Sequence, residues 1–73
     1  MTPHQFADRC RQLGVGQTLR LPRSDAEEMF GSTQISDVAE FLALRLGSPE
    51  HSGLQIQETG DGMVVTRLRL RNL

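Results

Sequence analysis

Two alternating runs separated by a glycine-rich turn constrain this chain more than any other feature. Residues 54–59 read LQIQET, residues 63–70 read MVVTRLRL, and the tripeptide GDG lies between them. Alternation of apolar and polar residues is typical of strands that bury one face, and Asp-Gly is a common hairpin turn. The sequence therefore predicts an antiparallel hairpin at its carboxyl end.

The register of this hairpin determines which side chains are buried. A three-residue loop over 60–62 places Leu54 opposite Leu68, whereas a two-residue turn places Leu54 opposite Arg67 and mixes apolar with charged side chains. Because register follows the buried pattern, we predict the three-residue loop, with Leu68 and Leu70 facing inward. The opposite, exposed face then carries a row formed by Arg67, Arg69 and Arg71.

The amino-terminal segment carries the signals of a helix start and then of a strand. Thr2 is a good N-cap, Pro3 suits the first helical position, and Gln5 completes a capping box. Apolar residues follow at helical spacing, which predicts a helix over about 3–13. The alternating residues after it predict a short strand at about 17–21.

Two more helices are predicted in the middle of the chain. Ser24 and Glu27 form a second capping box, which predicts a short helix at about 25–30. The next helix begins at residue 33 or 36 and ends at 46, before a glycine and a proline that cannot continue it. The segment 47–53 is predicted to be a loop.

The resulting order is helix, strand, helix, helix, strand, strand. It predicts one α+β domain over residues 1–73 with a small three-stranded antiparallel sheet. This order resembles that of winged helix-turn-helix domains. AEEMFGSTQISDVAEFLALRLG (26–47) is similar to their helix-turn-helix portion, and SGLQIQETGDGMVVTRLRL (52–70) is similar to their closing hairpin, the wing. The resemblance implies a winged-helix-like fold and, in most members, a third helix that enters the DNA major groove.

The charges on the predicted third helix are unfavourable for binding in a DNA groove. Asp37 and Glu40 lie near its start, where acidic groups are unfavourable beside phosphates, and Arg45 is its one basic residue. Residues 24–62 carry eight acids and one arginine, while both ends of the chain are basic, and the net charge is −1. A domain built to neutralise DNA is usually basic overall, so we expect direct DNA binding to be secondary.

The stretch VGQTLRLPRSDAEEMFG (15–31), the chain length and the use of arginine as the sole basic residue are similar to the small RNA polymerase-binding regulators of Xanthomonas-infecting phages. Those regulators block initiation by the host enzyme and allow transcription to read through terminators. The resemblance implies bacterial RNA polymerase as the partner. It also implies inhibition of initiation, a role in antitermination, and action in the host cytoplasm.

The residues carry no sign of catalysis. There is no P-loop, no zinc-protease motif and no dinucleotide-binding fingerprint, and one cysteine with two histidines cannot build a structural zinc site. We therefore expect no enzyme activity, no cofactor and no metal. The lone cysteine fits a reducing compartment, and no apolar run reaches membrane-spanning length, so we expect a cytoplasmic monomer without membrane contact.

These observations predict a protein-docking surface, for which the sequence offers a first and a second candidate. The first comprises the arginines of the hairpin and first strand, namely Arg67, Arg69, Arg71, Arg20 and Arg23. The second is the apolar pair Met29 and Phe30 beside the acidic helix start. Three alternatives stay open: a repressor that binds DNA through its wing and strands, an interaction module without nucleic acid, and an arginine row that is simply the wet face of an antiparallel sheet.

Overall fold

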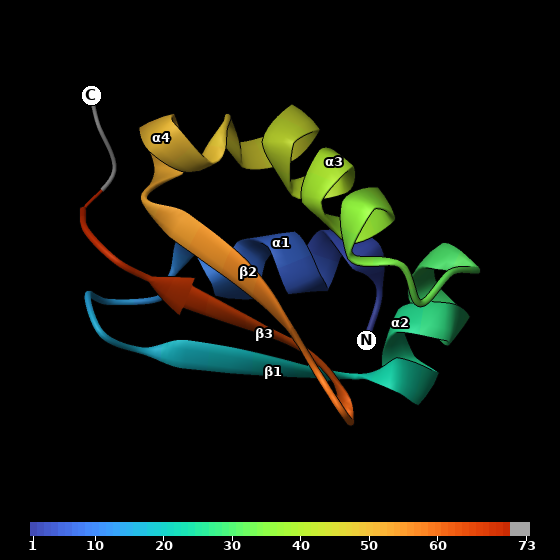
Figure 1. Ribbon diagram of the computed structural model, residues 1–73. Helices are drawn as coiled ribbons and strands as arrows, with labels where there is room; N and C mark the ends of the chain where they lie inside the picture. Colours follow the sequence, from blue (N-terminus) through green and yellow to red (C-terminus); the bar gives the residue numbers. More distant parts are fainter. Residues whose placement is uncertain (71–73) are drawn as a thin grey trace.

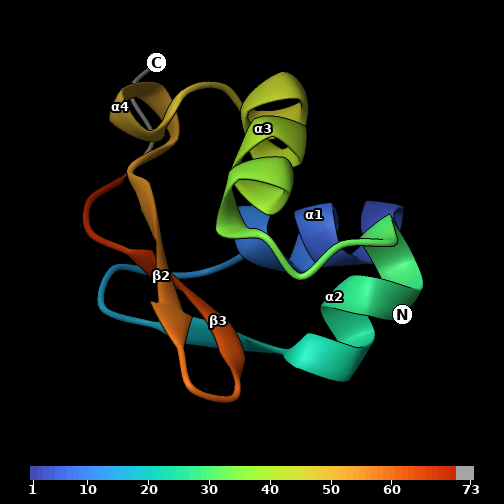
Figure 2. The same ribbon diagram turned by 45° about the vertical axis from the view of Figure 1, so that its right-hand side comes forward.

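The computed structural model describes residues 1–70, with the sheet on one side and most of the helices on the other (Figure 2). The elements in chain order are α1 (Pro3–Arg11), β1 (Thr18–Pro22), α2 (Arg23–Phe30), α3 (Ile35–Leu46), α4 (Pro49–Ser52), β2 (Leu54–Thr59) and β3 (Gly62–Arg67). The three strands are antiparallel in the order β1-β3-β2. The predicted α+β class and element order are confirmed, and a short extra helix, α4, occupies the segment predicted as a loop (Figure 1).

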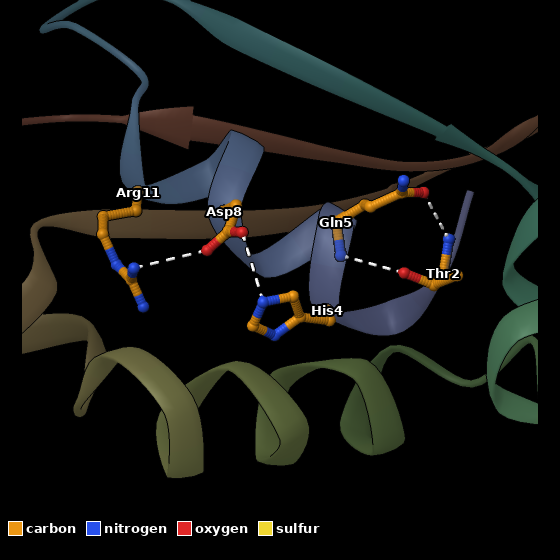
Figure 3. A network of polar contacts seen from close by, with 5 residues as sticks. All are labelled: Thr2, His4, Gln5, Asp8 and Arg11. Carbon is orange, nitrogen blue, oxygen red and sulfur yellow. Dashed lines mark hydrogen bonds and ion pairs between the residues drawn. The ribbon is translucent and has the colours of Figure 1, made fainter.

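Helix α1 begins as the sequence predicts. The Thr2 hydroxyl accepts a hydrogen bond from the Gln5 N–H at 3.1 Å, and the Thr2 N–H donates to the Gln5 side-chain oxygen at 3.0 Å (Figure 3). These two bonds satisfy backbone and side-chain groups reciprocally, as a capping box requires. The helix ends at Arg11, two residues before the predicted end.

Helix α2 does not use its predicted capping box. It begins at Arg23, its N-cap is Pro22, and no side chain caps it. The Arg23 N–H instead donates to the carbonyl of Asp61, in the hairpin turn, at 2.8 Å. A tertiary contact therefore satisfies the first N–H of α2, and the helix starts one residue before the predicted N-cap Ser24.

The hairpin register differs from the prediction. The strands β2 and β3 join through a two-residue turn at Gly60-Asp61, and Leu54 lies opposite Arg67. The predicted pairing of Leu54 with Leu68 is therefore wrong. Strand β3 ends at Arg67, and Leu68, predicted to be inward, is 57% exposed.

Pairing with β1 explains this register. β3 is central, so its inward residues must match β1 as well as β2. Met63 and Val65 lie opposite Leu21 and Leu19 of β1, and Val65 also lies opposite Ile56 of β2. This arrangement makes one apolar layer across all three strands. The predicted register was based on the pairing of β2 with β3 alone. It is wrong because β1 also determines which residues of β3 face inward.

The core lies between this layer and the helices. Its central side chain is Phe6 of α1, which is fully buried and meets Phe30 edge-on with ring centroids 6.0 Å apart. Phe41 of α3 extends the aromatic cluster, with its ring centroid 5.1 Å from that of Phe30. The buried apolar residues are Phe6, Ala7, Cys10, Leu21, Ala26, Val38, Leu42, Leu46, Leu54, Met63 and Val65.

Candidate protein-docking surface

Arg67 is buried, which contradicts its predicted place on an exposed row. Only 5% of the residue is exposed, and its guanidinium donates to four backbone carbonyls. The acceptors are Leu13 at 2.9 Å, Arg11 at 3.1 Å, Cys10 at 3.3 Å and Ser52 at close range. Cys10 and Arg11 end α1, Leu13 follows that helix, and Ser52 ends α4, so Arg67 holds two helix ends against the sheet.

Backbone carbonyls at helix ends explain why an arginine side chain is stable in the interior of the protein. The last carbonyls of a helix have no partner within the helix, and they form the negative end of its dipole. A guanidinium offers five N–H donors in a planar fork and satisfies several such carbonyls at once. Arg67 is thus engaged in holding the fold together and is not available for docking on a partner.

The same surroundings suppress the reactivity of Cys10. Burial raises the pKa of the Cys10 thiol from its ordinary value of 9.0 to about 12, and the positive charge of Arg67 opposes this rise without cancelling it. The thiolate is the nucleophile and metal ligand. The neutral, buried thiol therefore behaves as a small apolar core residue.

The other predicted arginines do not form one surface. Arg20 is exposed and lies opposite Val64, on the sheet face away from the helices, where it approaches the Asp61 carboxylate at 3.4 Å. Arg23 donates to the carbonyl of Gly60 at 3.3 Å, so both hold the hairpin turn beside β1. Arg69 is exposed beside α4. The predicted site residue Arg71 lies outside the described residues.

Met29 and Phe30, the second predicted surface, belong to the edge of the core. Both are half-buried and pack against the buried cluster. The ring of Phe30 is held between those of Phe6 and Phe41. The pair therefore offers little free apolar area to a partner.

A large apolar groove lies between α3 and β2 and has a volume of about 550 Å³. Helix α4 and the segment after β3 also contribute to its walls, and Glu50 and Arg69 are its charged residues. We name it the α3–β2 groove. Its apolar walls include Ile35, Ala39, Ala43, Leu54, Ile56 and Leu68. The groove was not predicted from the sequence. Its one sequence signal is the pair Ala39 and Ala43, spaced i, i+4 on α3, whose small side chains leave space where the helix faces β2.

The groove runs beside a free sheet edge, because β2 is an outer strand. The Leu68 N–H donates to the Gly53 carbonyl at 2.7 Å, just beyond the paired residues of the hairpin. Hydrogen bonds alternate along an antiparallel pair, so the odd-numbered residues of β2 bond to β3. The backbone groups of the even-numbered residues Ile56 and Glu58 consequently point toward the open edge.

The remaining polar clusters are surface features. On α1, the Asp8 carboxylate lies 3.4 Å from the His4 ring and 3.3 Å from the Arg11 guanidinium. The three residues lie on one face of the helix, on successive turns (Figure 3). Within residues 1–70, no three His, Cys, Asp or Glu side chains gather in a way that could hold a metal ion. No helix in the same range is both long and apolar enough to cross a membrane.

Comparisons of the chain with protein-family models, with curated proteins and with solved structures found no match. The resemblance to winged helix-turn-helix domains therefore stays a prediction from element order.

Proposed function

We propose that this chain is a non-catalytic transcription regulator that binds bacterial RNA polymerase in the bacterial cytoplasm. It inhibits initiation and also has a role in antitermination. The α3–β2 groove is the observation that carries the protein-binding part of the proposal. An open apolar groove bordered by a few charged residues is typical of surfaces that bind partners. The polymerase as partner is supported by the resemblance of residues 15–31.

The charge distribution favours protein over DNA as the partner. On α3, the helix that would enter the major groove, Asp37 and Glu40 are exposed, and the Asp37 carboxylate accepts a hydrogen bond from Ser32. The burial of Arg67 removes one of the cations available to a phosphate-binding face. A DNA-binding repressor is the second candidate, and a protein-interaction module without nucleic acid is the third.

Retention from a bacterial lysate tests the partner. The tagged full chain is expected to retain polymerase subunits, while an unrelated tagged protein of similar charge retains none. In transcription with purified components, the chain is expected to reduce the promoter-dependent product and to leave preassembled elongation complexes active. Failure to retain any polymerase subunit would overturn the proposal.

DNA titration separates the second candidate from the first. Binding of duplex DNA is measured at two salt concentrations with the full chain. We expect only weak binding without sequence preference. Sequence-specific binding that falls steeply as salt rises would replace the polymerase proposal by the repressor, because counterion release makes phosphate contacts salt-dependent.

A further inference from the structure

We propose that the α3–β2 groove binds an extended segment of another protein, which pairs with β2 as a fourth strand and inserts apolar side chains between β2 and α3. The segment carries apolar residues at alternate positions and a basic residue near the hairpin end of β2. This proposal rests on the protein-binding part of the proposed function. It does not depend on the partner being RNA polymerase.

The free edge of β2 provides the backbone half of such a site. Unpaired N–H and C=O groups on an edge strand are a template for another strand. At Ile56 and Glu58 these groups point away from β3. The N–H of Leu54, by contrast, already donates a hydrogen bond to the Ser52 hydroxyl at 3.3 Å. An added strand would therefore pair along the middle and hairpin end of β2. Five or six residues of partner, at about 3.4 Å each, match this length.

The groove provides the side-chain half. The side chains of Leu54 and Ile56 line it from β2, and those of Ile35 and Ala39 line it from α3. In a strand added to β2, every second side chain would point to the same side of the sheet and enter this space. The small side chains of Ala39 and Ala43 leave room for them between the helix and the strand.

An extended segment fits better than a helix. A helix satisfies its own backbone groups and would leave the edge groups of Ile56 and Glu58 unpaired. A strand satisfies the edge and fills the groove together, which is the pattern of β-strand addition. Figure 1 shows α3 passing above β2, with β2 as the strand of the sheet nearest to it.

The charges around the groove set the chemistry of the partner. At the Leu54 end, Glu50 and Arg69 both line the groove and offset one another. At the hairpin end Glu58 is exposed, and within residues 1–70 it takes part in none of the ion pairs, whereas the Asp61 carboxylate of the turn is already close to Arg20. A basic residue facing Glu58 would complement this charge and direct the encounter.

Selection from a random library of short displayed peptides tests the proposal without using the polymerase. The full chain is the bait, and the enriched peptides are then titrated into the isotopically labelled chain and followed by NMR. We expect enriched sequences with apolar residues at alternate positions and a basic residue. We expect hydrogen exchange at the Ile56 and Glu58 amides to slow by about tenfold or more on binding.

Two neighbouring residues of α3 supply a matched pair of variants. Ala43 lines the groove, whereas Leu44 does not line it and is 81% exposed. Ala43→Trp would fill the groove and is expected to weaken peptide binding by about tenfold or more, a loss that filling the site readily produces. Leu44→Trp adds a comparable ring next to it and should leave affinity unchanged.

A proline tests the edge separately. Glu58→Pro removes an edge N–H that makes no bond to β3, and proline is tolerated on edge strands. It should weaken binding more than Glu58→Ala does, because the alanine removes only the charge. Circular dichroism on each variant checks that the fold is retained.

The outcomes distinguish this proposal from the proposed function. Absence of enriched peptides, peptides that bind as helices, or equal affinity of the two tryptophan variants would overturn strand addition. If Ala43→Trp still retains polymerase from lysate as the original chain does, the groove is not the docking site even though the proposed function holds. If peptides pair with β2 while no polymerase subunit is retained, the proposed function fails and strand addition stands.

Discussion

The guanidinium of Arg67 donates to the backbone carbonyl of Leu13 at 2.9 Å, although the two residues are 54 positions apart. Leu13 follows α1, and Arg67 is the last residue of β3. The contact therefore joins the first helix of the chain to the last strand of the sheet. The other bonds from the same guanidinium extend this junction to α4.

Loss of the Arg67 guanidinium is expected to destabilise the protein strongly. Arg67→Met keeps much of the apolar stem but leaves buried carbonyls without donors, and such unsatisfied groups cost about 1–3 kcal/mol each. We expect the free energy of unfolding, measured with urea, to fall by about 3 kcal/mol. Arg69→Met is the matched control, because Arg69 is exposed, and its effect should stay within about 0.5 kcal/mol. Equal losses would show that burial of Arg67 contributes nothing.

The stability of the protein is expected to fall at high pH because of Cys10. The pKa of this thiol is about 12 in the folded chain and has its ordinary value of 9.0 when unfolded. Below pH 9 both states hold the proton. As pH rises from 9 toward 12, only the unfolded state loses it, so the free energy of unfolding should fall by about 1.4 kcal/mol per pH unit.

Composition makes this pH effect easy to isolate. The chain has no lysine and no tyrosine, and arginine stays protonated throughout the range. Cys10→Ala should therefore abolish the slope between pH 9 and 12, whatever it does to stability at neutral pH. Urea denaturation at several pH values measures both variants, and a slope that persists in Cys10→Ala would contradict the assignment.

Two glycines with the same backbone conformation should respond differently to alanine. Gly31 and Gly53 have φ values of 66° and 73°, which L-residues rarely adopt. A Cβ at Gly31 meets open space, whereas one at Gly53 would overlap the carbonyl of Arg69. We expect Gly31→Ala to cost about 1 kcal/mol from conformation alone, and Gly53→Ala to cost about 3 kcal/mol because the backbone must also move. Thermal unfolding of both variants checks the order, and a larger loss for Gly31→Ala would contradict it.

The two helix starts with predicted capping boxes make another matched pair. Thr2→Ala removes the hydrogen bond to the Gln5 N–H and should cost about 1 kcal/mol. Ser24→Ala should change the free energy of unfolding by less than about 0.5 kcal/mol, because no side chain caps α2. A loss at Ser24 as large as that at Thr2 would show that the predicted box forms after all.

Local sequence signals predicted much of the fold. The Thr2–Gln5 box, the apolar spacing of α3 and the alternation in β1, β2 and β3 each depend on neighbours within a few residues, so they can be recognised without the partner elements. They predicted the α+β class and the order of the main elements. The same signals were wrong at the start of α2, where the carbonyl that receives the first N–H comes from Asp61.

Tertiary packing decided what local signals could not. Strand β3 carries apolar residues on both faces, so its own pattern allows two registers. The choice was made by β1, which sets Leu19 and Leu21 opposite Val65 and Met63. That choice places Arg67 inside the protein, where carbonyls from two helix ends satisfy it.

The candidate site follows the same division. Sequence alone determined the types and order of the main elements, the segregated charge and the presence of arginines in the hairpin. Only the tertiary structure decided that Arg67 is buried, that Arg20 and Arg69 lie apart, and that α3 and β2 leave an apolar groove beside a free strand edge. The reason is that register and the spacing between elements depend on which residues meet across the fold, and those residues lie far apart in the chain.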